Sequence, residues 1–470
     1  MTTTTEPIPT PTQASSTTAN TVTATPEHTD TATATGTGTG TVADAGTVAV
    51  TDMPRARRDL ALPTIYLGSF GAFVGIAIAD IVYPLLILGF TGKPVLAGLF
   101  GAVQFSALVL CALPAGDFAD RHDRRRILIG GETVRALLST VLAVTLAAGH
   151  VWLVEIYLIA AVLGACQPFS NVRTLALRKL VPADRLIKAL SVQQGVSAAA
   201  QLVGPALGTL LYSLDRSLPF VAIAAGTAVS ALCAHFVRFD GRPDPAPSAN
   251  AAPAPAPAAS GGRKRGDGAL AGLGIVWRHP VMRATLIFAM LFNLVSMPLD
   301  LDVILQARHE GVPTHFLGLI LACSAGGALL GAPLVPKVHA RLRPGRLLAA
   351  FGVTVSLGCL AMALPSDGLL LAVGMTAIGF VIPAAVVLVD VLILQQVPDH
   401  QRGRVLGAVN TLIALGTPLG AAFGGTLLQV FSPTTVFCGV AAGLTCVTLY
   451  ALAQRDLRRA DWPTTTVGQG

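Results

Sequence analysis

The chain has 470 residues, of which 53% are hydrophobic and only 12% are charged, and its mean hydropathy is +0.66. Soluble domains carry about 25% charged residues, so this composition excludes an ordinary soluble globular protein. The net charge of +7 would suit a nucleic-acid partner, but the basic residues lie between apolar runs and form no basic face. We therefore expect a lipid bilayer as the partner, and no nucleic acid.

The first part of the chain differs from the rest. Residues 1–60 are rich in Thr, Ala, Pro and Gly and contain almost no large apolar side chain. Such a segment cannot bury enough surface to offset its ordering entropy, which predicts a disordered tail. It lacks the apolar stretch of a signal peptide. Since Arg55, Arg57 and Arg58 precede the first apolar run, we expect this tail in the cytoplasm.

From about residue 62, apolar runs of about 20 residues follow one another, each long enough to cross the hydrocarbon core. They predict twelve transmembrane helices near 62–90, 95–115, 127–148, 152–176, 188–212, 217–237, 282–305, 314–336, 345–364, 368–394, 404–427 and 433–454. A Pro/Ala-rich break between the sixth and the seventh run is typical of a solvated linker. The predicted organisation is a cytoplasmic tail at 1–60, an N-terminal six-helix bundle at 61–238, a cytoplasmic linker at 239–280, a C-terminal six-helix bundle at 281–455 and a cytoplasmic tail at 456–470.

The distribution of basic residues predicts the orientation of these helices. Of the 32 Lys and Arg, only Lys93, Arg216 and Arg308 fall in the predicted outer loops, and Arg135 falls within the third helix. All others lie on the side of the two termini, as the positive-inside rule requires for cytoplasmic loops. We expect a multi-pass protein of the inner or plasma membrane with both termini in the cytoplasm.

The two halves share a common spacing. Val181-Pro182 before the fifth helix recurs as Val397-Pro398 before the eleventh. The same offset in residue number relates Leu190 to Leu406, Gly204 to Gly420, Gly208 to Gly424 and Leu211 to Leu427. The predicted fold is thus an all-α membrane protein with two pseudo-symmetric six-helix bundles, and a binding site is expected between the halves near mid-membrane.

A charge-dense segment, GDFADRHDRRR at residues 116–126, joins the second and third predicted helices. A glycine would let two helix ends approach, an acid could lie at a helix N-terminus, and arginines offer bidentate partners to carboxylates. We expect a conformational latch made of Gly116, Asp117, Asp120, Arg121, Asp123, Arg124 and Arg125. The alternative is that the arginines only set the orientation, which leaves the interleaved acids unexplained.

This segment resembles the signature of the major facilitator superfamily, and it looks most like the branch of drug and siderophore exporters that includes enterobactin and macrolide efflux proteins. Residues 180–186 (LVPADRL) and 401–407 (QRGRVLG) match further pieces, the latter giving a second cytoplasmic motif at Arg402, Gly403 and Arg404. The resemblance covers about residues 60–455 and implies the fold of two six-helix bundles and a transport activity. The equivalent segment of the second half, after Gly331, lacks the acid.

The fifth helix contains Gly204-Pro205-Ala206-Leu207-Gly208, which resembles the antiporter motif of exporters in this superfamily. In the family, this motif is thought to seal the outward path. A proline and two glycines allow a bend and close packing, and simple packing of small residues explains the segment equally well. Ala200 and Thr209 stand where the fuller pattern has glycines. Residues 156–166 also lack the arginine that proton-coupled relatives often have in the fourth helix.

Acidic residues at membrane depth are candidates for binding a substrate or a proton, because stranding a charge in hydrocarbon costs several kcal/mol. Asp80 in the first helix could take up a proton or bind a cation, or it could pair with a neighbouring helix. Asp300 and Asp302 occupy different faces of the seventh helix, where exposure at the interface is an equal alternative. Asp390 near the inner end of the tenth helix suits a gate. Glu132 and Arg135 could pair with each other.

We expect a secondary transporter that exports a small molecule (a drug, antibiotic or siderophore-like metabolite) by alternating access, with a proton or other ion gradient as driving force, acting as a monomer. The alternatives are an importer of a small metabolite and a transport-inactive receptor of the same fold; the low aromatic content of 6% favours export over sugar import. No Walker phosphate loop, HExxH or CxxC spacing occurs, so we expect no enzyme, no cofactor and no metal site.

Overall fold

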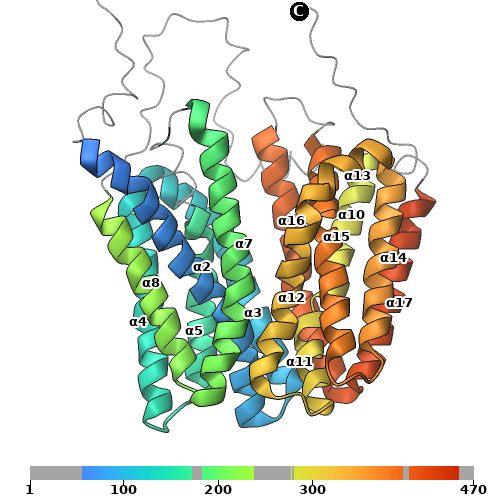
Figure 1. Cartoon of the computed structure of the whole chain (residues 1–470), viewed down its shortest axis with the longest axis horizontal. Coiled ribbons are helices and arrows are strands. Elements are labelled where there is room, and N and C mark those ends of the chain that lie inside the picture. Colours follow the sequence, from blue (N-terminus) through green and yellow to red (C-terminus); the bar gives the residue numbers. More distant parts are fainter. Residues whose placement is uncertain are drawn as a thin grey trace, which may run out of the picture. The chain divides into compact units, whose positions relative to one another are not determined.

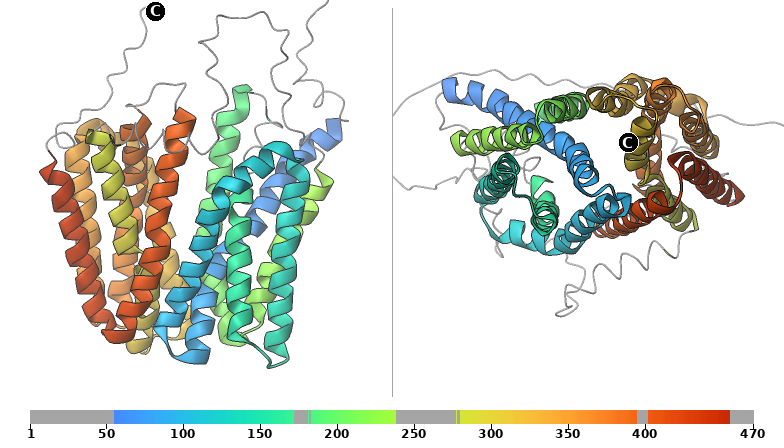
Figure 2. Two further views of the ribbon diagram at one scale, coloured as in Figure 1. Left: turned by 180° about the vertical axis from the view of Figure 1, so that it is seen from behind. Right: turned by 90° about the horizontal axis from the view of Figure 1, so that it is seen from below.

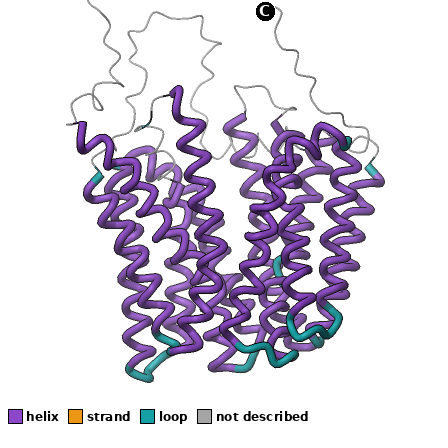
Figure 3. Tube along the Cα trace, in the orientation of Figure 1, coloured by secondary structure: helices purple, strands orange, loops and turns teal. Residues whose placement is uncertain are grey.

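A computed structural model describes residues 55–171, 181, 183–237, 277, 280–394 and 402–454, and all of them belong to the compact unit Ala49–Gly470. These residues form helices joined by short turns (Figure 3). The predicted tails and the linker fall almost wholly outside the described residues, so the predicted boundaries stay predictions.

The helices fall into two groups along the chain (Figure 1). The N-terminal bundle contains α2 (Arg55–Thr91), α3 (Pro94–Arg121), α4 (Arg124–Ala147), α5 (Leu153–Cys166), η1 (Gln167–Asn171), α7 (Ala183–Leu214) and α8 (Leu218–Phe236). The C-terminal bundle contains α10 (Pro280–Ser296), α11 (Leu299–His309), α12 (Thr314–Gly331), η2 (Ala332–Leu334), α13 (Val335–Arg341), α14 (Pro344–Met362), α15 (Leu369–Leu394), α16 (Arg402–Val430) and α17 (Pro433–Ala453).

Helices pack mainly within their own bundle, α2 against α7 and α8 in the first and α12 against α15 in the second. Two seams join the bundles: α7 packs against α12, and α3 packs against α16 (Figure 2). We call the end of the helices with the turns at His122 and at Leu342 the basic end. The other end, with the turns at Gly92 and Gly311, is the short-turn end.

The structure confirms the all-helical membrane fold. Among the described residues, eleven helical stretches are long and apolar enough to cross a membrane, and the shorter apolar stretch Leu153–Phe169 stands at the predicted span 152–176. The second predicted span, 95–115, lies within α3, whose apolar membrane-spanning part is Pro94–Ala112. Helix α3 continues to Arg121, so Gly116 lies within the helix and the segment before α4 is mostly helical.

The seventh predicted span, 282–305, is confirmed as one membrane-spanning stretch, Pro280–His309, but it is not a single helix. It is divided into α10 and α11 at Met297 and Pro298. Pro298 has no backbone N–H to donate to residue 294 and its ring crowds the preceding turn, which is how a proline breaks a helix. Helix α11 therefore begins within the membrane-spanning stretch, with Asp300 and Asp302 in its first turn. Discontinuous helices of this kind form ion and substrate sites in many transporters.

Residues related by the constant offset between the two halves make equivalent packing contacts. A Cβ atom added to Gly208 of α7 would lie 3.1 Å from Ile78 and 3.2 Å from Val82 of α2. Its counterpart Gly424 of α16 faces Pro298, at 2.8 Å in the same test, and Pro298 is the counterpart of Val82 by the same offset. The two glycines thus hold equivalent helices, which is the relation expected of a duplicated unit.

Candidate functional site

Asp80 occupies the exposed position of an otherwise buried stretch of α2. Ala77, Ile78, Val82 and Tyr83 around it are at most 1% exposed, whereas Asp80 is exposed. Among the described residues, no hydrogen bond or ion pair involves its carboxylate. A carboxylate at membrane depth that remains accessible and unpaired can accept a proton or bind a cation.

Two other charged side chains interact electrostatically with Asp80: Asp300 of α11, in the other bundle, and Arg135 of α4. Asp300 is exposed and Arg135 is half-buried. Asp80 is therefore close enough to α11 of the C-terminal bundle for the two carboxylates to interact. Two acids share one arginine at this position, so a proton or a cation bound at Asp80 would reduce the excess of negative charge.

Arg135 is the participant that the sequence analysis missed. We expect it to pair with Glu132 on the same helix, which is buried at 3% exposure, and that pairing stays a prediction; the structure adds an electrostatic interaction of Arg135 with Asp80 of α2. The signal was available in the sequence, because Arg135 is the single basic residue deep within a predicted span, and a charge there needs a partner of opposite sign.

Asp302 lies apart from this group. Its side chain is 0% exposed, while Asp300, two residues earlier, is exposed. The two acids thus occupy different faces of the helix, as expected from the sequence. For Asp302, the alternative of exposure at the interface is wrong. Only Asp300 can join Asp80 in an accessible site.

The antiporter-like segment of α7 makes contacts on two of its faces. Gly204 and Gly208 face α2, and a Cβ atom on Gly204 would overlap Ala77. One position further along, Pro205 and Thr209 face α12 of the other bundle, so close that a Cβ atom on Gly318 would overlap both residues. The segment therefore links the Asp80-bearing part of α2 to the opposite bundle.

Thr209 makes a hydrogen bond across this seam. Its hydroxyl is buried, donates to the Pro205 carbonyl at 3.1 Å and accepts the backbone N–H of Gly318 at 3.1 Å. The His315 carbonyl oxygen lies 3.5 Å from the same hydroxyl. Sequence comparison treats Thr209 as a departure from a glycine pattern, but here it supplies a polar contact between the bundles.

Helix α16 repeats the arrangement on the other seam. Ala421 and Gly425, the counterparts of Pro205 and Thr209 by the offset between the halves, face Gly98 of α3. A Cβ atom on Gly98 would lie 2.5 Å from the Ala421 carbonyl oxygen and 2.6 Å from the Gly425 Cα atom. This seam is a direct backbone contact. Both seams join the part of each helix toward the short-turn end.

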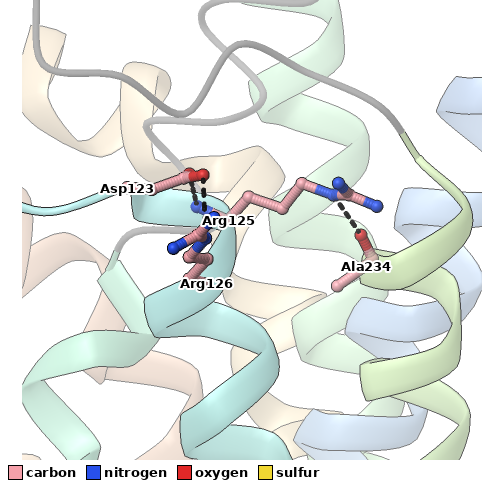
Figure 4. A network of polar contacts seen from close by, with 4 residues as sticks. All are labelled: Asp123, Arg125, Arg126 and Ala234. Atoms are coloured by element: carbon pink, nitrogen blue, oxygen red, sulfur yellow. Dashed lines mark hydrogen bonds and ion pairs between the residues drawn. The ribbon is translucent and has the colours of Figure 1, made fainter.

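Of the latch residues that the structure describes, Asp123 and Arg125 bind within the N-terminal bundle (Figure 4), whereas Arg124 Nε is buried without a hydrogen-bond partner among the described residues. Asp123 caps α4 by accepting the Arg125 N–H at 2.9 Å, and Arg126 lies 3.8 Å from its carboxylate. The Arg125 guanidinium donates to the carbonyl oxygens of Ala234, at 3.2 Å, and His235. A cation at the last carbonyls of α8 is stabilised by the helix dipole. In this conformation, Arg125 ties α4 to α8.

Several predicted site residues have side chains outside the described part of the chain. They are Gly116, Asp117, Asp120 and Arg121 at the end of α3, Asp390 in α15, and Arg402, Gly403 and Arg404 at the start of α16. Their predicted roles in the latch, the gate and the second motif stay predictions.

Two six-helix bundles with charged residues facing each other between them define a polytopic membrane transporter. The Major Facilitator Superfamily matches the chain over residues 65–391 and again over 301–468. The chain belongs to this superfamily, whose members are transporters and not enzymes.

The chain is similar to two efflux proteins. It is 24% identical over 409 residues to the multidrug efflux pump Tap of Mycolicibacterium fortuitum, covering 84% of this chain and 96% of that protein. It is 23% identical over 371 residues to macrolide efflux protein A of Streptococcus pyogenes, covering 76% and 86%. These relatives confirm the resemblance to drug efflux transporters.

Solved structures show the same fold at low identity. The nucleoside transporter NupG has a TM-score of 0.64 and 15% identity, covering 84% of this chain and 98% of that chain. A bacterial homologue of the iron transporter ferroportin, in an inward-facing state, has a TM-score of 0.62 and 18% identity, covering 87% and 100%.

Proposed function

We propose that this protein is a proton-driven exporter of a small molecule. The observation that carries the proposal is the accessible Asp80 carboxylate, which interacts with Asp300 across the bundle interface and with Arg135. Binding of a proton or of a cationic substrate at Asp80 would change the charge between the two bundles. Because the two events would use the same carboxylate, they exclude each other, which is the requirement for antiport.

The seams support alternating access. Both hold the bundles together toward the short-turn end. If the basic end faces the cytoplasm, as the positive-inside rule favours, this conformation is closed toward the outside and Asp80 is loaded from within. Both termini are then cytoplasmic, and the membrane is the cell's inner or plasma membrane. We also propose that the protein acts as a monomer, because each half of one chain supplies one side of the site.

The efflux relatives support a drug, antibiotic or siderophore-like substrate. A macrolide is a suitable first probe, since one relative is named a macrolide efflux protein, and the cationic dye ethidium is a second. Everted membrane vesicles with the full chain, energised to acidify their lumen, should accumulate at least one of these probes. A protonophore should release it.

The test of the site is Asp80→Asn, which removes the titratable group with little change in shape. We expect accumulation to fall to the level of vesicles without the protein, while size-exclusion chromatography shows a folded monomer. Asp367→Asn is a matched control, because Asp367 is exposed in the turn before α15 and its φ of 50° suits asparagine. Undiminished accumulation by Asp80→Asn would remove Asp80 from the mechanism. Accumulation by intact cells that falls when the gene is deleted would show import.

A further inference from the structure

Helix α11 carries a second polar feature, a row of buried side chains on one face. Asp302, Gln306 and Glu310 follow one another at intervals of four residues, which places them on successive turns. Asp302 is 0% exposed, Gln306 is 3% exposed and Glu310 is half-buried. The row runs from the first turn of α11 to the short-turn end of the C-terminal bundle.

Two hydrogen bonds hold the end of the row near the surface. The Gln306 side-chain amide donates to Glu310 Oε1 at 2.9 Å. Glu310 Oε2 accepts the backbone N–H of Gly368 at 2.8 Å, and Gly368 is the residue before α15. The Glu310 carboxylate thus fixes the direction of the Gln306 amide and connects α11 to the turn between α14 and α15.

The inner end of the row is different. Both carboxyl oxygens of Asp302 and Oε1 of Gln306 are buried without a hydrogen-bond partner. All three are acceptors if Asp302 is ionised, and a buried carboxylate without a donor costs several kcal/mol. If Asp302 is protonated, it has one O–H to donate, and Gln306 Oε1 is the unused acceptor one turn away on the same face.

Charged neighbours do not offer Asp302 another partner. Cys359 of α14 is the titratable group that interacts with it electrostatically. On α2, Asp80 interacts with Asp300, and His315 of α12 is exposed. The charged residues of α3 and α16 lie at the basic end, and α17 has none. Among the described residues, no cation interacts electrostatically with Asp302.

We propose that Asp302 is a proton-binding site inside the C-terminal bundle, and that Gln306 couples its occupancy to the short-turn end. With the proton bound, the Asp302 O–H donates to Gln306 Oε1 and the Gln306 amide donates to Glu310. When the proton leaves to water, the carboxylate needs a donor, so the Gln306 amide turns toward it and Glu310 loses that hydrogen bond. Only the O–H bond breaks; the other changes are exchanges of hydrogen bonds.

Infrared difference spectroscopy of the purified full chain in lipid nanodiscs tests the site directly. Between neutral and strongly alkaline pH, the wild type should lose the C=O stretching band of a protonated carboxyl group. Asp302→Asn should lack this band already at neutral pH, and the control Asp367→Asn should keep it. Identical neutral-pH spectra for wild type and Asp302→Asn would overturn the proposal.

A second variant tests the hydrogen bond and also covers the case in which Asp302→Asn does not fold. In Gln306→Leu the carboxyl has no acceptor, so its C=O band should persist but move to higher frequency. An unmoved band would show that Gln306 is not the acceptor and would overturn the coupling.

The role of the Asp302 proton in driving export rests on the proposed function, but the binding of that proton does not. The Asp302 site and the proposed function can therefore be disproved separately. Asp80→Asn should stop export and still show the Asp302 band. A band that vanishes in Asp80→Asn would assign the bound proton to Asp80 and overturn the Asp302 site. Normal export by Asp80→Asn, with the Asp302 band still present, would contradict the proposed function and leave the Asp302 site standing.

Discussion

The two seams between the bundles use equivalent residues but close in different ways. In the α7–α12 seam, the Thr209 hydroxyl accepts the Gly318 N–H at 3.1 Å. In the α3–α16 seam, Gly425 replaces the hydroxyl, and its backbone lies directly against Gly98. The two seams therefore lie at equivalent positions in the two halves. The residue at the position of Thr209 and Gly425 determines whether a seam is held by a polar hydrogen bond or by close backbone packing. A polar bond can exchange with water, but backbone packing tolerates no added atom.

Distances across each seam can be measured separately by pulsed electron paramagnetic resonance on spin-label pairs at exposed positions. Ser213 and Phe316 report on the α7–α12 seam, and Lys93 and Gln429 report on the α3–α16 seam. The pairs show whether a change opens its own seam or both. If each bundle moves as a rigid body, both distances should lengthen together.

The largest effect is expected for Gly98→Leu. The new Cβ atom would meet the Ala421 carbonyl oxygen at 2.5 Å and backbone atoms of Gly425, none of which can move without moving α16. Overpacking of this kind costs about 3 kcal/mol, enough to reduce the seam-closed population more than a hundredfold. Both label pairs should separate, and vesicle accumulation of the probe should be lost.

Gly439→Leu is the matched control for Gly98→Leu, because a Cβ atom at Gly439 of α17 would meet nothing within 4 Å. It should leave both distances and the accumulation unchanged. A Gly98→Leu protein with closed seams would mean that the glycine contact is not what brings α3 and α16 together.

Thr209→Val should have an intermediate effect on the other seam. Valine keeps the shape but leaves the buried Gly318 N–H without its acceptor, at a cost of about 2 kcal/mol. Opening the seam would expose this N–H to water, so the change should shift the population toward the open form about 30-fold. The control is Thr426→Val, since Thr426 is exposed and its hydroxyl donates only to Ala422 of its own helix. Equal distance distributions for the two variants would count against a role of the hydroxyl.

Much of the fold was predictable because a bilayer leaves few options. Runs of about 20 apolar residues must be helices, and the basic residues between them give an orientation. The constant offset between the halves, found from pairs such as Gly208 and Gly424, corresponds to real packing against Val82 and Pro298. The break at Pro298 was missed because the apolar run continues across it, and apolarity alone does not detect a lost backbone hydrogen bond.

The candidate site was predictable only in part. Asp80 stood out because a lone acid in an apolar run is costly. Its relation to Arg135 and Asp300 depends on how three helices from two bundles face each other, and sequence spacing within one helix does not contain that information. For the same reason, the role of Thr209 as a contact to α12 could not be seen from a motif in α7.

The smallest effects are expected for two tyrosines that contact a seam helix from within the N-terminal bundle. Tyr157 of α5 donates to the Leu96 carbonyl of α3 at 2.9 Å, whereas Tyr212 of α7 lies 3.5 Å from the Leu85 carbonyl of α2. Tyr157→Phe should therefore loosen the α3–α16 seam by about 1 kcal/mol, a fivefold change in population. Tyr212→Phe should change the α7–α12 distance hardly at all, because a hydrogen bond of 3.5 Å contributes little. The reverse ranking would show that support from the second tyrosine matters more than its geometry indicates.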